Sequence, residues 1–349
     1  MMPEEWPIGA GPGDQTQRQP RLRGRDRLRT VRTDFFLNPA ERLTEQERAL
    51  MTAMLHCLVS DVAAALRAAL PNGRLAANDE SDSGLIEELA TAGLLDEVEL
   101  MALLLRRADE ERIASAARAR SGRREARVLQ GLVSHDYGAV AAAAMALILG
   151  RGRRRDRFGQ CLVAFDDLSA GAADALVHSV AAGLRRELAA ARGAPGADLE
   201  LAEASAQVLD DRDDERGIDA LTGSLVHFLE EAGSLTDELV LAAANEGEIT
   251  FVAEVLARRA GVPSDAVVDE LLSGEAKPVM ALLRAADGSR ELAAGLLAGI
   301  GDLLGIDDAG AAITGFDSMT DAEVQAARAW LVTAPSYRSA LERLGQGRG

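Results

Sequence analysis

A repeat of 27 residues in the C-terminal half constrains the fold of this chain more than any other feature of its sequence. Residues 235–261 align without a gap with residues 262–288, and at six aligned positions both residues are apolar. Three aligned pairs are identical: Gly247 with Gly274, Glu248 with Glu275, and Gly261 with Gly288. Each unit reads as a helix, a glycine-marked turn, a second helix and a glycine stop. Because one such unit cannot bury its apolar face alone, the pattern predicts a stacked αα solenoid.

The repeat also predicts where its helices begin and end. Thr236 or Asp237 in the first unit, and Ser264 in the second, are good N-cap residues. Gly261 and Gly288 close the two units at the same phase of the repeat. We therefore expect both glycines to end a helix with a positive φ.

The composition supports a helical fold for the whole chain. Ala and Leu contribute 66 and 49 of the 349 residues, whereas aromatic residues are only 3%. Such a chain favours strong helix formers over β-branched and aromatic residues, which excludes a β-sandwich or barrel and argues against a doubly wound sheet. The sequence predicts an all-α, HEAT-like αα-repeat array, with a bundle-like N-terminal part and a solenoid C-terminal part.

Three regions follow from the local patterns. Residues 1–33 are rich in Pro, Gly, Gln and Arg and predict a disordered tail. Residues 34–192 predict an N-terminal helical domain, and residues 197–345 a C-terminal αα-repeat domain. The sequence Gly-Ala-Pro-Gly at 193–196 marks the expected boundary between them.

Helices of the N-terminal region are predicted from caps and breakers. Thr44 and Glu47 form a capping box at the start of a long helix that runs to about Leu70. Another long amphipathic helix is expected over residues 168–192. Between them, shorter helices are expected at about 84–92, 96–107, 109–120, 123–134 and 136–149, with Gly93, Gly122 and Gly150 as breakers.

Charge is distributed very unevenly along the chain. The net charge is −18, and residues 193–349 carry 11 basic and 29 acidic side chains. Residues 106–157 carry 13 Arg and 6 acidic side chains, so this segment alone is strongly basic. The candidate partner-binding basic surface consists of Arg118, Arg120, Arg123, Arg124, Arg127, Arg151, Arg153, Arg154, Arg155 and Arg157. It could be a solvated, internally paired face, a contact for another protein, or a site for phosphate-bearing partners.

No residue pattern indicates catalysis, a metal site or a cofactor. The four histidines are far apart in the sequence, and two cysteines, Cys57 and Cys161, exclude a disulfide scaffold or a cysteine-built zinc site. Ser134, His135 and Asp136 are consecutive and point apart, so they cannot form a triad, and Ser134 or Asp136 is expected to cap a helix. The acidic residues 210–217 lack the glycine and the final glutamate of a calcium loop.

The sequence predicts no membrane span. The first residues contain no apolar stretch after basic residues, so no secretory signal is expected. The longest apolar run, residues 139–149, has half the length that a bilayer requires. We therefore expect a cytoplasmic protein.

Three groups of motifs carry a family resemblance: Asp34–Leu37 with Arg42–Met51, Ala141–Gly150 with Arg151–Phe158, and Phe165–Leu168 followed by Val180–Arg185. They resemble an uncharacterised family of helical proteins from alphaproteobacteria, the domain of unknown function 2336. The resemblance covers roughly residues 34–319. It implies HEAT-like paired helices, no assigned activity and no active-site residue.

These observations favour a non-catalytic cytoplasmic scaffold or adaptor that presents a helical-repeat surface to a protein partner. The alternative is a nucleic-acid-associated helical-repeat protein that uses the arginine-rich segment 118–157, with action on DNA bases as one variant of this role. The acidic C-terminal half argues against it because it repels phosphate. We expect no cofactor, and a homo-oligomer is compatible with the sequence.

Overall fold

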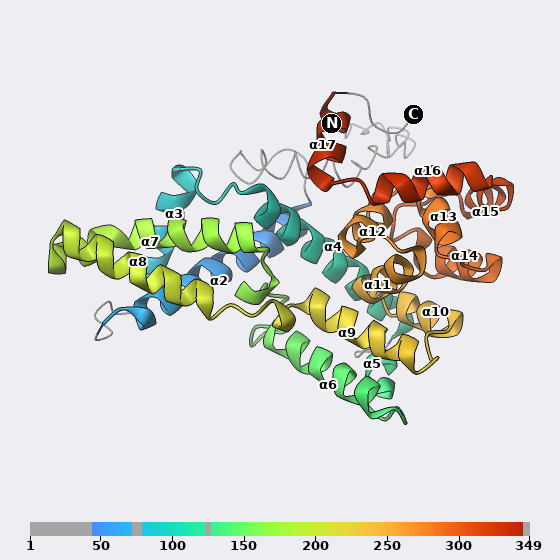
Figure 1. Ribbon diagram of the computed structural model, residues 1–349, viewed down its shortest axis with the longest axis horizontal. Helices are drawn as coiled ribbons and strands as arrows, with labels where there is room; N and C mark the ends of the chain where they lie inside the picture. The colour runs from blue at the N-terminus through green and yellow to red at the C-terminus, as the bar shows by residue number, and fades with distance from the viewer. Residues whose placement is uncertain (1–43, 72–78, 123–126, 345–349) are drawn as a thin grey trace, which may run out of the picture.

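Figure 1 shows the computed structural model, which describes residues 44–71, 79–122 and 127–344. These residues form α-helices joined by turns, and within them the only β-type pairing is an isolated bridge between Arg155 and Cys161. The predicted all-α class is confirmed. The predicted tail, residues 1–33, lies outside the described residues.

The helices of the first half, with one 3₁₀ turn, are α2 (Glu45–Ala69), α3 (Asp79–Thr91), α4 (Val98–Ser121), α5 (Arg127–Leu132), α6 (Gly138–Arg153), η1 (Phe165–Asp167), α7 (Ala170–Arg192) and α8 (Ala194–Asp210). The second half contains η2 (Asp214–Arg216), α9 (Ile218–Glu231), α10 (Asp237–Asn245), α11 (Ile249–Ala260), α12 (Ser264–Leu271), α13 (Ala276–Ala285), α14 (Arg290–Leu296), the π-helical turn η3 (Leu297–Gly301), α15 (Ala309–Ser318), α16 (Asp321–Leu331) and α17 (Pro335–Arg343).

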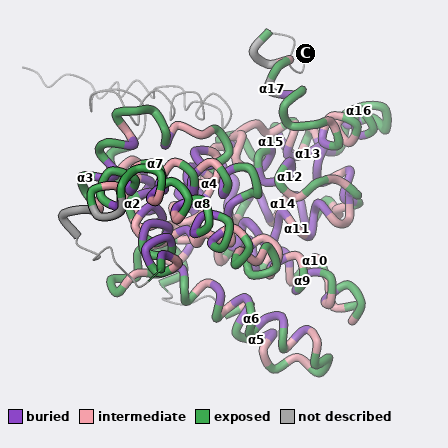
Figure 2. Tube along the Cα trace, turned by 60° about the vertical axis from the view of Figure 1, so that its left-hand side comes forward, coloured by how far each residue is buried: buried purple, intermediate pink, exposed green. Residues whose placement is uncertain are grey.

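Two apolar cores organise these helices. The first collects buried residues of α2, α3, α7 and α8, and the second collects those of α5, α6 and the helices from α9 to α16. Helix α4 belongs to both, because Leu100 to Ala108 pack in the first core and Ile113 packs in the second. Figure 1 shows α4 running from one group of helices to the other, and Figure 2 shows buried positions concentrated on α11 to α13.

The expected boundary at 193–196 lies at the junction of α7 and α8, which pack closely on each other. Helix α8 also packs on α2, and α6 packs on α9. The two cores therefore each combine segments that are distant in the sequence. A division into independently folding domains at this point stays a prediction.

The 27-residue offset is kept at the turns inside the two repeat units. Gly247 and Gly274 have φ values of 77° and 76°, which L side chains rarely adopt. Gly261 ends α11 in the left-handed conformation, as predicted, with a φ of 67°. Thr236 caps α10 as predicted, whereas Ser264 is the first residue of α12 rather than its cap. Whether these pairs form a HEAT-like array stays a prediction.

The expectation of a positive φ at Gly288 is wrong. Helix α13 ends at Ala285, earlier in its unit than α11 does in the preceding one, and the left-handed residue is Asp287, with a φ of 51°. The N–H of Gly288 then donates to the carbonyl of Leu283 at 2.8 Å. A Cβ at Gly288 would lie 2.9 Å from that same oxygen, so this position still excludes a side chain.

The capping box of Thr44 and Glu47 is confirmed at the start of α2. Two predicted breaks are wrong. Helix α4 runs without interruption from Val98 to Ser121, since no Gly or Pro occurs within it to end the helix. Gly150 lies inside α6, where the side chain of Leu221 from α9 occupies the space that a Cβ would need.

Within the described residues, α2 alone has the length and apolar composition of a membrane span. The core helix of a soluble protein meets the same criteria, and the buried residues of α2 belong to the first core. This feature does not decide where the protein resides, and the cytoplasmic location stays a prediction.

Candidate functional site: an arginine-lined cleft

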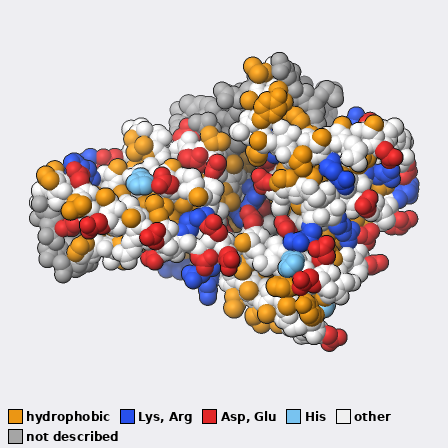
Figure 3. All heavy atoms as spheres, viewed as in Figure 1, with side chains coloured by type: hydrophobic (Ala, Val, Ile, Leu, Met, Phe, Trp, Pro, Cys, Tyr) orange, Lys and Arg blue, Asp and Glu red, His pale blue; other side chains and the backbone are white. Residues whose placement is uncertain are grey.

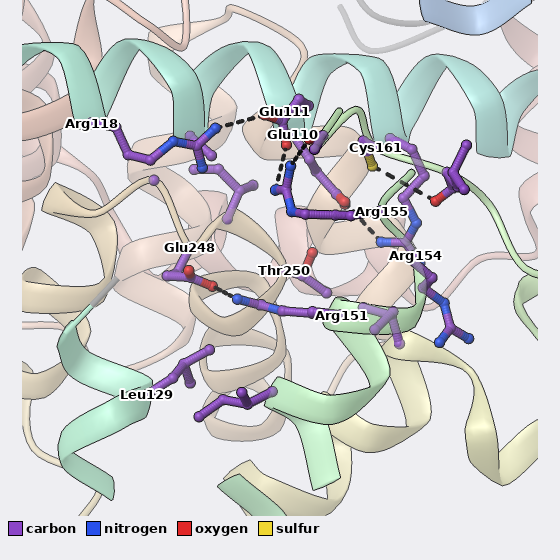
Figure 4. Close-up of a pocket in the computed structure, with 18 of the residues that line it drawn as sticks. Glu110, Glu111, Arg118, Leu129, Arg151, Arg154, Arg155, Cys161, Glu248 and Thr250 are labelled. Carbon is purple, nitrogen blue, oxygen red and sulfur yellow. Dashed lines mark hydrogen bonds and ion pairs between the residues drawn. The ribbon is translucent and has the colours of Figure 1, made fainter. Parts of the chain in front are cut away.

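A cleft of about 590 Å³ lies where α4, the end of α6 and the turn between α10 and α11 meet. Figure 4 shows that its charged residues come from three distant segments: Glu110, Glu111 and Arg118 from α4, Arg151, Arg154 and Arg155 from the end of α6 and the residues just after it, and Glu248 from the turn before α11. Arg107 of α4 also lines the cleft. Its apolar lining consists of Ala114, Leu129, Ile148, Leu162, Ile218 and Ile249. An apolar lining with a few fixed charges is typical of a binding site.

Four residues of the predicted basic surface meet in this cleft: Arg118, Arg151, Arg154 and Arg155. Of the others that the structure describes, none lines the cleft. Arg120 pairs with Asp302, Arg153 is exposed, Arg157 is exposed beside the ring of Phe158, and Arg127 begins α5. Arg123 and Arg124 lie outside the described residues. Binding by any of these arginines stays a prediction.

Arg154 connects three of the elements that surround the cleft. Its guanidinium is buried and forms two hydrogen bonds with Asp167, at 2.7 and 2.8 Å. It also donates to the backbone carbonyls of Gly150 and Arg216. Asp167 in turn accepts from the backbone N–H of Ile218 at 2.9 Å. This pair joins the end of α6 to η1 and to the start of α9.

The other cleft arginines are paired with carboxylates of the same chain. Arg118 and Arg155 share the carboxylate of Glu111, at 2.6 and 3.0 Å. Arg151 pairs with Glu248. Such pairing inside the chain is one of the three alternatives that the sequence left open for this segment.

Arg107, which lines the cleft, and its neighbour Arg106 both bind Asp219 of α9. Burial alone raises the pKa of Asp219, but Arg107 and Arg106 outweigh this effect and hold its pKa well below the usual range. The carboxylate therefore stays ionised, and this contact fixes α9 against α4.

Cys161 lines the same cleft. Burial and the neighbouring Glu111 raise the pKa of its thiol to about 11. The thiol is therefore protonated near neutral pH, and the thiolate is the form that acts as a nucleophile or metal ligand.

The sequence analysis missed the acidic residues of the cleft, although two signals pointed to them. Glu248 is one of the three identities between the repeat units. Glu110 and Glu111 lie within a dense run of charges on one helix, and Arg107 pairs with Glu110 at a spacing of three residues. The meeting of these segments is a tertiary contact, which local patterns do not show.

The segment from Ser134 to Asp136 forms a turn before α6. His135 contacts the hydroxyl of Ser234 at 3.0 Å and accepts from the N–H of Tyr137. Neither Ser134 nor Asp136 caps α6, because Tyr137 takes that position without a side-chain hydrogen bond. Across the described ranges, no three His, Cys, Asp or Glu residues are grouped to hold a metal ion.

A family model described as an uncharacterised protein conserved in bacteria (DUF2336) matches residues 87–329, about 70% of the chain. The match includes all three segments that build the cleft. It begins later than the resemblance seen in the sequence, so the motifs at 34–51 lie outside it. No curated protein and no solved structure matches the chain.

Proposed function

We propose that this chain, which belongs to the DUF2336 family of uncharacterised bacterial proteins, is a non-catalytic scaffold or adaptor whose arginine-lined cleft receives an acidic segment of a protein partner. The observation that carries the proposal is the shared pairing of Glu111. One carboxylate serves two arginines, Arg118 and Arg155, so this cluster has one positive charge more than it has negative charges.

The geometry around Glu111 fits a carboxylate side chain of a partner. Arg118 and Arg155 are 30% and 39% exposed, so a ligand can reach both guanidinium groups. Arginine binds carboxylates through parallel hydrogen bonds, which suits docking of an acidic peptide. The apolar lining, with Leu129 and Ile249, offers contact area for the partner's apolar side chains.

The alternative, a nucleic-acid-binding surface, requires a row of cations that follows a phosphate backbone. Here Glu110, Glu111 and Glu248 lie between the arginines of the cleft. The 29 acidic side chains of residues 193–349 add to the repulsion. The charge pattern therefore favours a partner with a few separated carboxylates over a polyphosphate.

Capture of partners from a lysate of the organism that encodes the chain tests the proposal. Tagged wild-type protein is compared with Arg118→Glu/Arg155→Glu and with a matched control, Arg185→Glu/Arg186→Glu, which changes two exposed arginines of α7. We expect proteins that both wild type and control retain, and that the cleft variant loses by at least tenfold in quantitative mass spectrometry.

Circular dichroism and melting curves verify that all three proteins are folded. Capture of the same proteins in the same amounts by all three variants would show that the cleft is not the docking surface.

A further inference from the structure

Helix α6 has two apolar faces and is packed on only one of them. Val140, Ala144 and Leu147 are buried where α6 packs on α9. The outer face presents Ala142, Met145, Ala146 and Leu149, with Met145 42% and Leu149 55% exposed. A helix that is apolar on all sides normally lies between two layers. Figures 1 and 2 show α6 at the edge of the molecule, where its inner side packs on α9 and on the short helix α5.

The two ends of this outer face carry opposite charge. Asp136 is exposed just before α6, and Glu231 lies close to Tyr137 at the same end. At the other end, Arg153 and Arg157 are exposed. Figure 3 shows apolar side chains along the lower edge of the molecule, with basic side chains where α6 ends and acidic ones where it begins.

We propose that the outer face of α6 binds the same face of a second copy of this chain, with the two helices antiparallel. A two-fold axis makes such an interface self-complementary. In the antiparallel arrangement, Asp136 of each copy faces the basic end of the other, near Arg153. A parallel arrangement would place like charges together, which costs affinity.

The sequence of the face fixes the register. With the axis between Met145 and Ala146, the side chain of Ala142 faces Leu149 of the second copy, so a small residue lies opposite a large one. Met145 then packs beside Ala146 of the second copy at the centre. Opposed small and large side chains let the helices approach closely and pack without voids.

The area of this contact predicts a weak dimer. The 16 residues of α6 span roughly 24 Å at ~1.5 Å per residue. A single helix pair of this length buries less than the roughly 800 Å² per partner of a standard stable interface. We therefore expect a dissociation constant in the range of about 1 to 100 μM, which is typical of a reversible association.

Sedimentation equilibrium over about 1 to 500 μM tests the dimer, since this range brackets the expected dissociation constant. The wild-type chain should pass from monomer to dimer, and Met145→Glu should remain monomeric because two carboxylates would meet at the axis. The matched control is Leu199→Glu, which changes a side chain that is 62% exposed on α8. It should dimerise like the wild type.

A wild-type chain that stays monomeric throughout, or a Met145→Glu chain that dimerises normally, would overturn the proposal. Binding of the monomer to anionic lipid vesicles through this face would overturn it as well, by assigning the face to a membrane surface. Arg118→Glu, a change in the cleft on α4, should leave dimerisation unaffected, so failure of the cleft proposal does not decide this result.

Cysteine cross-linking tests the orientation, in a chain whose Cys57 and Cys161 are replaced by Ser. Ala146→Cys should form a disulfide-linked dimer on mild oxidation because it lies at the axis. Ala142→Cys should not link to itself, since the rise of ~7 helical residues, about 10 Å, separates position 142 of one copy from position 142 of the other. Efficient self-linking of Ala142→Cys would contradict the antiparallel register.

Discussion

Replacement of Asp167 by Ala is expected to lower the free energy of unfolding by about 3 to 5 kcal/mol, the usual cost of removing one partner of a buried ion pair. The side chain of Asp167 is 1% exposed and that of Arg154 is 9% exposed. Without the carboxylate, Arg154 retains only backbone carbonyls as partners. The N–H groups of Ala164 and Ile218 also lose their acceptor.

Urea denaturation of wild type, Asp167→Ala and the control Asp198→Ala measures this effect. Asp198 pairs with Arg185 on the surface, where such a pair contributes little. We expect a large shift of the midpoint for Asp167→Ala and none for Asp198→Ala. Equal midpoints for the two variants would show that the Arg154 pair does not hold the end of α6 to η1 and α9.

Replacement of Gly247 by Ala is expected to lower the free energy of unfolding by about 2 to 5 kcal/mol. A positive φ costs a residue with a Cβ about 1 to 2 kcal/mol. The added Cβ would also lie 2.6 Å from the Cα of Ala114, in the backbone of α4. Overpacking of this kind costs typically 1 to 3 kcal/mol more.

Gly261 provides the matched control for Gly247. Its φ of 67° is similar, but a Cβ there would meet no atom within 4 Å. Gly261→Ala should therefore lower the free energy of unfolding by only about 1 to 2 kcal/mol, the cost of the positive φ. If thermal denaturation showed that both variants lose the same amount of stability, the turn before α11 would not be held against α4.

The local signals in the sequence predicted the ends of several elements. The capping box at Thr44, the stop at Gly261 and the paired turns at Gly247 and Gly274 depend on a few neighbouring residues, so they can be read from the chain. Gly288 shows the limit of this reasoning. A repeat fixes the phase of the apolar residues, but the residue at which a helix ends also depends on packing around it.

The candidate site could be predicted only in part. The sequence drew attention to Arg118, Arg151, Arg154 and Arg155 as a group, and it also included arginines that the fold separates from the cleft, such as Arg120 and Arg157. Nothing local distinguishes the structural role of Arg154 from the accessible positions of Arg118 and Arg155. That difference depends on Asp167 and Glu111, which the fold brings to the arginines.

The central claim is that the cleft arginines are paired with the chain's own carboxylates, and that the one positive charge in excess at Glu111 serves a protein partner. Fluorescence anisotropy with labelled single-stranded and duplex oligonucleotides, across a salt series, tests it most directly. Near physiological salt we expect the wild type to bind no more tightly than ~10⁻⁴ M, the weak end of non-specific affinity. A Glu111→Gln/Glu248→Gln variant should bind measurably more tightly at low salt because Arg118, Arg151 and Arg155 lose their carboxylate partners. Micromolar binding by the wild type, with a steep salt dependence that Arg118→Ala/Arg153→Ala/Arg155→Ala abolishes, would contradict the claim and favour a nucleic-acid partner.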